Sequence, residues 1–194
     1  MARAERGRLR IIGGRWRGRR LPVPEQQGLR PTGDRIRETL FNWLAPVIAG
    51  SRCLDCFAGS GALGLEAASR GAAEVVMIER AAPVARLLRA NAAVLTGADQ
   101  SVAIDVVQTD ALDWLARTPP RPFDICFLDP PFAAGLMGDT LGLLAVRGWL
   151  VPSALVYLET ARTGRPPDLP AGWSLLRDKH AGQVRYALAE APAH

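Results

Sequence analysis

The sequence has only three cysteines, Cys53, Cys56 and Cys126, and all three lie in apolar stretches. Three are too few for the disulfide framework of a small secreted protein. Cys53 and Cys56 are three residues apart in a predicted strand, so they face opposite sides of it, and neither a second pair nor a histidine lies near them in the sequence. We therefore expect no metal site, and we interpret the three cysteines as core residues.

A long hydrophobic run is also absent, because no stretch approaches the roughly 18 uninterrupted apolar residues of a membrane-spanning helix. The arginine-rich start has neither the apolar segment nor the cleavage site of a secretory signal peptide. We therefore expect a cytoplasmic protein without a membrane partner. The 194 residues, of which 48% are hydrophobic, suffice for one compact domain, and we expect a monomer.

Positive charge is concentrated at the N-terminus. Residues 1–20 contain eight arginines and one glutamate, a net charge of +7, so the rest of the chain carries −2 of the formal total of +5. The arginines are interleaved with apolar residues, and Gly13-Gly14 can form a tight turn, which predicts a short basic β-hairpin extension within residues 1–24. The apolar residues of this segment are Leu9, Ile11, Ile12, Trp16 and Leu21.

A basic hairpin of this kind favours a nucleic-acid partner. Arginine side chains bind phosphates and an aromatic ring can stack on an unpaired base, so we expect RNA or DNA. A solvated, disordered tail is the alternative interpretation of a charge cluster, but the interleaved apolar residues argue against it. The candidate nucleic-acid contacts are Arg8, Arg10, Arg15, Trp16, Arg17, Arg19 and Arg20.

Residues 25–194 have the pattern of one α/β domain. Apolar residues at helical spacing predict a helix that begins near Gly33-Asp34 and ends before Pro46. Strands and helices then alternate along the chain. The predicted strands are residues 52–57, 74–79, 104–109, 123–129 and 154–159, and the predicted helices between them are residues 62–69, 83–95, 111–116 and 136–146.

The predicted strands are nearly continuous apolar runs such as VVMI and ICFL, which is typical of a parallel sheet covered by helices on both faces. Two more predicted strands, residues 173–177 and 184–189, are joined by a connection too short for a helix, which predicts an antiparallel hairpin. The sequence therefore predicts a Rossmann-like, doubly wound α/β fold whose mostly parallel sheet ends in an antiparallel hairpin.

The segment LDCFAGSGALGLE places Gly59, Gly61 and Gly64 in a G-x-G-x-x-G pattern between the first predicted strand of this domain and its helix. Such glycines let the backbone approach a nucleotide-containing cofactor, and the pattern alone also suits a dinucleotide. Asp55, just before the loop, would repel a pyrophosphate but attract the ammonium of a methionine moiety. This favours S-adenosylmethionine.

Carboxylates also end the next two predicted strands. Glu79 could accept hydrogen bonds from ribose hydroxyls, and Asp110 could accept one from the adenine amino group, although Asp110 also has the position of a helix N-cap. Ligands of open α/β sheets bind at the carboxyl ends of the strands, so we expect one shared site. The candidate cofactor contacts are Asp55, Phe57, Gly59, Ser60, Gly61, Glu79, Arg80, Asp110 and Ala111.

The fourth predicted strand of the domain ends in Asp129-Pro130-Pro131-Phe132, the candidate catalytic residues. Its two prolines stiffen the backbone. Methylation of an exocyclic amine needs acceptors that bind its hydrogens and orient the nitrogen toward the methyl group. We expect the Asp129 carboxylate and the Pro130 carbonyl to be these acceptors, and Phe132 to stack on a flipped base. A simple strand-terminating turn is the alternative interpretation.

Taken together, these motifs resemble those of the bacterial 16S ribosomal RNA guanine-N2 methyltransferases, the RsmD-like enzymes. The resemblance covers most of the chain and implies a class I methyltransferase domain with an N-terminal hairpin extension. It further implies S-adenosylmethionine as the cofactor and a guanine N2 in 16S rRNA, or in the small ribosomal subunit, as the substrate. The matching segments are LRIIGGRWRGRRL, GLRPTGDRIRETLFNWL, LDCFAGSGALGLEAASRGA, FDICFLDPPF and KHAGQVRYAL.

The same resemblance, through the segment RETLFN, implies Arg37 and Thr39 as cofactor contacts, although a structural helix face fits them equally well. Three other functions remain open. A DNA adenine-N6 methyltransferase would use the same Asp-Pro-Pro-Phe chemistry, but the chain has no evident DNA-recognition domain. A nucleotide-dependent oxidoreductase could use the same fold, and a non-catalytic RNA-binding assembly factor could retain both motifs.

Overall fold

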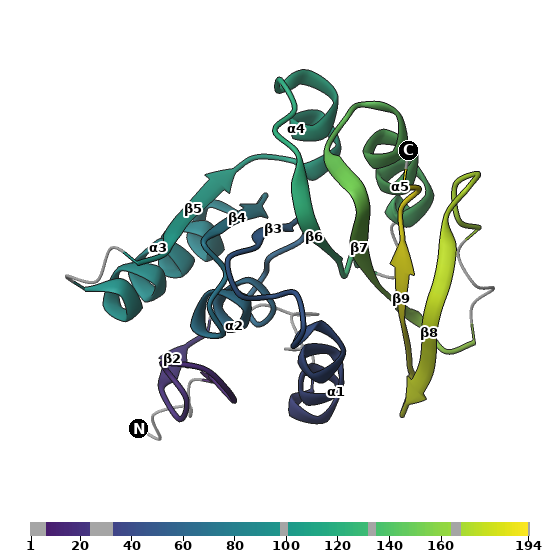
Figure 1. Cartoon of the computed structure of the whole chain (residues 1–194). Helices are drawn as coiled ribbons and strands as arrows, with labels where there is room; N and C mark the ends of the chain where they lie inside the picture. Colours follow the sequence, from purple (N-terminus) through teal and green to yellow (C-terminus); the bar gives the residue numbers. More distant parts are fainter. Residues whose placement is uncertain (1–6, 24–32, 98–100, 132–134, 164–167, 194) are drawn as a thin grey trace.

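The computed structural model describes residues 7–23, 33–97, 101–131, 135–163 and 168–193 (Figure 1). It contains a two-stranded sheet and a seven-stranded sheet with helices on both faces of the larger one. No helix in these ranges is long and apolar enough to cross a membrane. The elements are β1 (Arg8–Arg10), β2 (Arg20–Pro22), α1 (Asp34–Leu44), β3 (Arg52–Asp55), α2 (Gly64–Ser69), β4 (Glu74–Glu79), α3 (Ala82–Thr96), β5 (Ala103–Gln108), α4 (Ala111–Arg117), β6 (Phe123–Leu128), α5 (Leu136–Val146), β7 (Leu150–Ala161), β8 (Ser174–Ala181) and β9 (Val184–Glu190).

The strand order of the large sheet is β5-β4-β3-β6-β7-β9-β8. The pairs from β5 to β7 are parallel, whereas β9 pairs antiparallel with both β7 and β8. The chain order reverses between β3 and β6, which is the point where open α/β sheets bind ligands. These findings confirm the predicted doubly wound fold with an antiparallel end.

Alternate residues of the central strands enter opposite cores, as the period of two in a strand requires. Val75 and Phe127 belong to the core that includes residues of α1, α2 and α3. Val76 and Leu128 belong to the core that includes residues of α4 and α5. This double coverage explains why the strands are continuous apolar runs in the sequence.

The three cysteines are buried and unpaired, which confirms their interpretation as core residues. The Cys56 and Cys126 sulfur atoms lie 3.7 Å apart on neighbouring strands. Burial raises the pKa of the Cys53 thiol to about 12, so this group stays protonated at neutral pH. Among the described residues, no three His, Cys, Asp or Glu side chains are grouped so that they could hold a metal ion.

Two of the predicted elements, β4 and α5, have the predicted bounds, whereas β7 is longer than residues 154–159. Its pairing with β6 shifts between Phe123↔Leu150 and Ile125↔Leu155, so the additional residues at the start of β7 form a bulge. Pro152 lies in this bulge, where a missing N–H breaks no regular ladder. The predicted strand, residues 154–159, did not include this irregular part.

The N-terminal hairpin is present, but its turn is not the one predicted at Gly13-Gly14. The paired residues are Arg8↔Pro22, Leu9↔Leu21 and Arg10↔Arg20, so the connection between the strands runs from residue 11 to residue 19. Gly14, at φ 72°, lies against α2, because a Cβ atom on it would be 1.9 Å from the Ser69 carbonyl oxygen. Tertiary packing, which the sequence pattern does not reveal, therefore sets the length of the connection.

Main-chain and side-chain hydrogen bonds fasten this connection to the end of α2. The Arg15 N–H donates to the Ser69 carbonyl at 2.8 Å, and the Trp16 N–H donates to the Ser69 hydroxyl oxygen at 3.0 Å. The same hydroxyl donates to the Gly13 carbonyl at 2.6 Å. Leu9, Ile11, Trp16 and Leu21 belong to the α1–α3 core, so the hairpin packs on the body of the protein and shares that core.

A buried carboxylate joins the hairpin to two helices. Glu66 on α2 has no exposed surface. It accepts hydrogen bonds from the Ile12 N–H at 2.9 Å, from Arg37 Nη1 at 3.4 Å and from Arg70 Nε at 2.7 Å. Arg37 also donates to the Arg10 carbonyl at 2.9 Å and to Asp34 at 2.6 Å. We call Glu66, Arg37 and Arg70 the Glu66 network.

Replacing Gly14 by alanine should loosen the hairpin, because the new Cβ atom would collide with the Ser69 main chain. Gly18→Ala is the matched control: Gly18 also has a positive φ, 83°, but no atom lies within 4 Å of the position that its Cβ atom would take. Both variants carry a backbone strain of about 1–2 kcal/mol, and only Gly14→Ala adds a clash. We expect Gly14→Ala to lose clearly more unfolding free energy in urea denaturation. Equal losses in the two variants would contradict this packing.

Candidate active site

The carboxyl ends of the parallel strands β3, β4, β5 and β6 meet at one edge of the sheet, where the predicted acidic residues lie. Asp55 ends β3 and Glu79 ends β4. Asp110 follows β5 by two residues, and Asp129 directly follows β6. The sheet therefore gathers the four predicted carboxylates along the same edge.

The loop between β3 and α2 has the close backbone course that its glycines allow. Gly59 and Gly61 have φ values of 50° and 79°, and a Cβ atom on Gly61 would lie 2.4 Å from Leu88 Cδ1. A Cβ atom on Gly64 would lie 2.6 Å from Met77 Sδ. Larger residues would push the loop off β4 and α3, so the glycines are required by the fold as well as by a ligand.

Asp55 stabilises this loop through a hydrogen bond to its main chain. Its side chain is 2% exposed, and Oδ2 accepts the Gly64 N–H at 3.0 Å, at the start of α2. Burial raises the pKa of Asp55 to about 7, the Gly64 and Phe57 N–H groups oppose that rise, and the nearby Glu79 adds to it. The carboxylate is thus enclosed, and its contact with a methionine ammonium stays a prediction.

Glu79 ties the glycine loop to the next strand. Its Oε2 accepts the Gly59 N–H at 3.1 Å and its Oε1 accepts the Ala81 N–H at 2.6 Å. The side chain remains half-buried at the end of β4, so it fixes Gly59 and still lies at the edge of the sheet where a ligand would bind. Arg80, directly after Glu79, is exposed.

Asp110 caps α4, as its position before a helix suggested. Its Oδ1 accepts the Leu112 N–H at 2.9 Å and the Asp113 N–H at 3.3 Å. The capping interpretation is confirmed, whereas a contact with adenine stays a prediction. Of the remaining candidate cofactor contacts, Phe57 is half-buried, and Ser60 and Ala111 are buried.

The Asp129 motif follows β6 beside β3. Alternation along β6 directs Asp129 to the same face of the sheet as Phe127, the face covered by α1. Pro130 is buried and Pro131 is exposed. Phe132, the proposed stacking residue, lies outside the described residues.

Three further side chains lie on that face, on the two strands beyond Asp129, and the sequence pattern did not single them out. β6 and β7 pair at Phe127↔Tyr157 and Leu128↔Leu158, so Glu159 lies on the strand next to Asp129. The Tyr157 hydroxyl donates to Glu159 Oε2 at 2.8 Å. Tyr186 on the neighbouring strand β9 is register-paired with Glu159. Burial raises the pKa of Tyr157, and the negative charges of Glu159 and Asp129 raise it further.

One signal in the sequence does point to Glu159. It ends the predicted strand 154–159, just as the other candidate carboxylates end theirs. The signal is weak, because no glycine loop or proline pair follows this fifth strand.

Arg37 is not a surface contact for the cofactor in this structure. Its side chain is 1% exposed and is held in the Glu66 network, with further bonds to Asp34 and the Arg10 carbonyl. The Thr39 hydroxyl donates to the Arg35 carbonyl one turn earlier at 3.0 Å. The alternative interpretation of this segment as a structural helix face therefore describes both residues.

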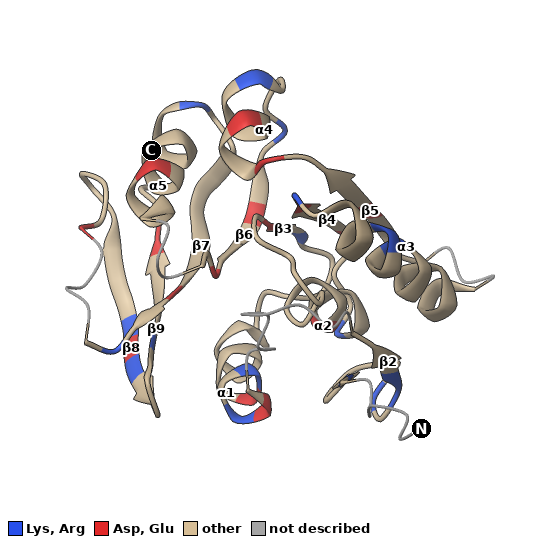
Figure 2. Ribbon diagram, turned by 180° about the vertical axis from the view of Figure 1, so that it is seen from behind, with Lys and Arg blue, Asp and Glu red and all other residues tan. Residues whose placement is uncertain are grey.

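Trp16 also differs from its expected role. Its ring is 6% exposed within the α1–α3 core, with the Arg15 guanidinium 5.7 Å from its centroid, so it offers no free face for base stacking. The arginines are exposed, and Figure 2 shows them on the hairpin. Arg15 donates to the Ser101 hydroxyl and Arg19 to the Val94 carbonyl, so these two help to dock the hairpin.

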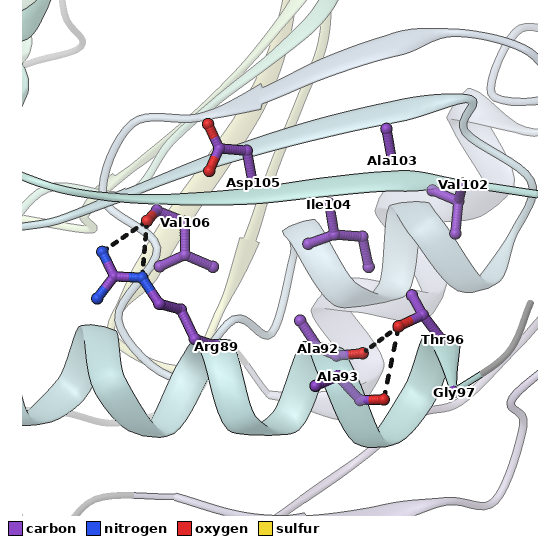
Figure 3. A pocket seen from close by; sticks show the side chains of 10 residues that line it. All are labelled: Arg89, Ala92, Ala93, Thr96, Gly97, Val102, Ala103, Ile104, Asp105 and Val106. Carbon is purple, nitrogen blue, oxygen red and sulfur yellow. Dashed lines mark hydrogen bonds between the residues drawn. The ribbon is translucent and has the colours of Figure 1, made fainter. Parts of the chain in front are cut away.

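A hollow of 640 Å³ lies away from this edge. It lies between α3 and β5 (Figure 3). Arg89 there donates to the Val106 carbonyl at 3.1 and 2.7 Å, and Thr96 donates to the Ala92 carbonyl at 3.1 Å. The side chains of Arg89 and Thr96 are thus hydrogen-bonded to main-chain carbonyls. None of the candidate site residues lines the hollow.

The site can be compared with known proteins. A family described as "Conserved hypothetical protein 95" matches residues 9–190. The chain is 52% identical to the ribosomal RNA small subunit methyltransferase D of Escherichia coli K12 over 187 residues, which cover 96% of this chain and 92% of that protein. The chain belongs to the RsmD family of methyltransferases.

Other RsmD-family members agree with this assignment. The Haemophilus influenzae protein of the same name is 47% identical, with 94% of each chain covered. The solved structure of the putative methyltransferase yhhF from E. coli has a TM-score of 0.88 and 50% identity, and the match covers 97% of this chain and all of that one. The RsmD-family fold therefore extends over both the hairpin and the seven-stranded sheet.

The raised pKa of Asp55 predicts a specific pH dependence of stability. Between its ordinary pKa of 3.8 and its folded pKa of about 7, the folded protein keeps a proton that the unfolded chain releases. The contribution of Asp55 to the unfolding free energy therefore falls as pH rises through this window. Asp55→Asn cannot titrate, so its unfolding free energy relative to wild type should increase from pH 5 to pH 8. Urea denaturation at both pH values tests this, and a constant difference would contradict it.

Proposed function

We propose that the chain transfers a methyl group from S-adenosylmethionine to the exocyclic N2 of a guanine in 16S ribosomal RNA within the small ribosomal subunit. The observation that carries this proposal is the position of Asp129. It follows β6, beside β3 and its glycine loop, at the point where the strand order reverses. The names of the relatives, ribosomal RNA small subunit methyltransferase D, support the choice of substrate.

The residues at the glycine loop fit S-adenosylmethionine. The positive φ values of Gly59 and Gly61 and the lack of room for a Cβ atom on Gly61 give a bare backbone surface next to the strand ends. Glu79 can accept from ribose hydroxyls while it holds Gly59, and Asp110 can accept from an adenine amine while it caps α4. When bound, this cofactor supplies an electrophilic methyl group on a sulfonium centre.

The protein's task is to orient the accepting amine. The lone pair of an exocyclic amine is delocalised into the base, so acceptors for its hydrogens must turn the nitrogen toward the methyl group. The Asp129 carboxylate and the Pro130 carbonyl can accept these hydrogens, and two prolines keep both rigid. No covalent nucleophile is needed. Stacking by Phe132 stays a prediction from the sequence.

The hairpin supplies the proposed RNA contact. Arg8, Arg17 and Arg20 are exposed, and the docking of the hairpin on α2 fixes the backbone that carries them. Figure 2 shows basic residues on the hairpin. A folded, fixed group of arginines binds phosphates with little loss of chain entropy. Selection of one nucleotide must come from the active site and the substrate's shape, because phosphate contacts carry no sequence information.

The direct test incubates the protein with isotopically labelled S-adenosylmethionine and small subunits that lack the modification, then identifies the labelled nucleoside by mass spectrometry. We expect N2-methylguanosine in 16S rRNA. Labelled N6-methyladenine in a parallel DNA reaction, with unlabelled RNA, would support a DNA methyltransferase. No label in either would support a non-catalytic assembly factor.

Asp129→Ala should lower kcat for this methylation by at least about 100-fold, since it removes a preorganised acceptor for the amine. Cofactor affinity, measured by calorimetry, should stay within a few-fold of wild type, because Asp129 is assigned to the amine. Asp129→Asn keeps one acceptor oxygen and should lose less activity. Cofactor binding lost in parallel, with the fold intact by circular dichroism, would refute the assignment.

A triple variant, Arg8, Arg17 and Arg20 to Ala, should weaken binding to small-subunit RNA and flatten its salt dependence. Each lost phosphate contact lowers the slope of log K against log salt by about 1. The control removes equal charge at Arg117, Arg121 and Arg147, three exposed arginines near α4 and α5. If both triple variants change the RNA affinity and its salt dependence equally, the hairpin is not part of the RNA interface.

A further inference from the structure

A row of register-paired residues leads from the edge of the sheet to Asp129. Lys179 on β8 pairs with Tyr186 on β9, and Tyr186 pairs with Glu159 on β7. Register-paired residues point to the same face of a sheet, and neighbouring strands lie about 4.8 Å apart. Glu159 therefore stands one strand away from Asp129, on the face where the amine is proposed to bind.

Glu159 is held in place rather than left free to rotate. It is 5% exposed, and the hydroxyl of the buried Tyr157 donates to its Oε2 at 2.8 Å. Tyr186, which is paired with Glu159 on the neighbouring strand, is stacked on Trp43 of α1 with ring centroids 5.6 Å apart. Glu159 therefore lies next to a packed pair of aromatic rings. A carboxylate has about four acceptor positions, so a bond to Tyr157 still allows it to accept from a ligand.

The chemistry of a purine edge decides what this arrangement can recognise. Guanine presents N1–H next to its N2 amine, so two adjacent groups are donors. Adenine presents an N1 acceptor next to its N6 amine, and a fixed carboxylate would repel that lone pair. Two neighbouring acceptor side chains, Asp129 and Glu159, thus match the guanine edge and oppose the adenine edge.

We infer that Glu159 selects guanine by accepting the N1–H of the target base while Asp129 accepts from N2, with Tyr157 positioning the Glu159 carboxylate. This inference rests on the proposed function, since it concerns the base that occupies the same site. The residue that orients the N2 amine, Asp129, follows β6, whereas the residue that selects the base through its N1–H, Glu159, lies on β7.

The test uses 2-aminopurine in place of guanine at the methylated nucleotide, once mapped, in 16S RNA reconstituted into small subunits. This analogue keeps the 2-amino group but has an acceptor at N1. Wild type should prefer guanine in kcat/KM by about 10- to 100-fold, the size expected for a hydrogen bond to a charged group. Glu159→Gln, whose amide can donate or accept, should lower that preference toward one.

Glu190→Gln, at the other end of β9, is the matched control and should keep the wild-type preference. 2-Aminopurine also lacks O6, but that loss is common to all the enzymes and cancels when preferences are compared. Tyr157→Phe keeps the carboxylate and removes its donor, so it should lower the preference a few-fold. This variant decides the question if Glu159→Gln does not fold.

A purely structural role for Glu159 would lower methylation of both substrates equally and leave the preference unchanged. An unchanged preference in Glu159→Gln, or in Tyr157→Phe if Glu159→Gln does not fold, would overturn the inference. Wild-type protein that fails to methylate guanine at all would instead refute the proposed function. The two failures are therefore distinguishable in one set of reactions.

Discussion

The buried carboxylate of Glu66 is the interaction on which the arrangement of the N-terminal half depends. A fully buried charge is costly unless it is paired and hydrogen-bonded, and Glu66 satisfies that need with two guanidinium groups and a main-chain N–H. Its partners come from α1, from the end of α2 and from the hairpin. Removing any one of them leaves this buried carboxylate with fewer donors, so its full set of partners forms only when these three parts of the protein assemble together.

That coupling links the glycine loop, where we propose that the cofactor binds, to the hairpin, where we propose that RNA binds. The helix that carries Glu66 begins at Gly64, where Asp55 accepts the N–H. Its other end, at Ser69, receives the hairpin connection. A six-residue helix thus has the glycine loop at one end and the basic extension at the other, and it fixes the distance between the arginines and the proposed site of methyl transfer.

Short-range patterns in the sequence predicted most of the fold and the edge of the sheet at which the candidate acidic residues lie. The apolar runs, the glycine loop and the Asp129 motif are local signals, and the structure places the acidic residues along one edge as expected. The failures concern long-range packing. Trp16 lies in a basic segment and its burial depends on the core beneath α2, and the charge of Arg37 says nothing of Glu66, which is 29 residues away.

The reversal of strand order between β3 and β6 divides the sheet into two halves, to which the proposed function assigns different roles. Residues up to β5 build the half beside the glycine loop, and β6 to β9 build the half around Asp129 and Glu159. The two halves also meet through α1, because Phe41 packs against Phe127 of β6 and Trp43 stacks on Tyr186 of β9. A change of the accepting base that rebuilt the C-terminal strands would therefore have to preserve the face that packs against α1.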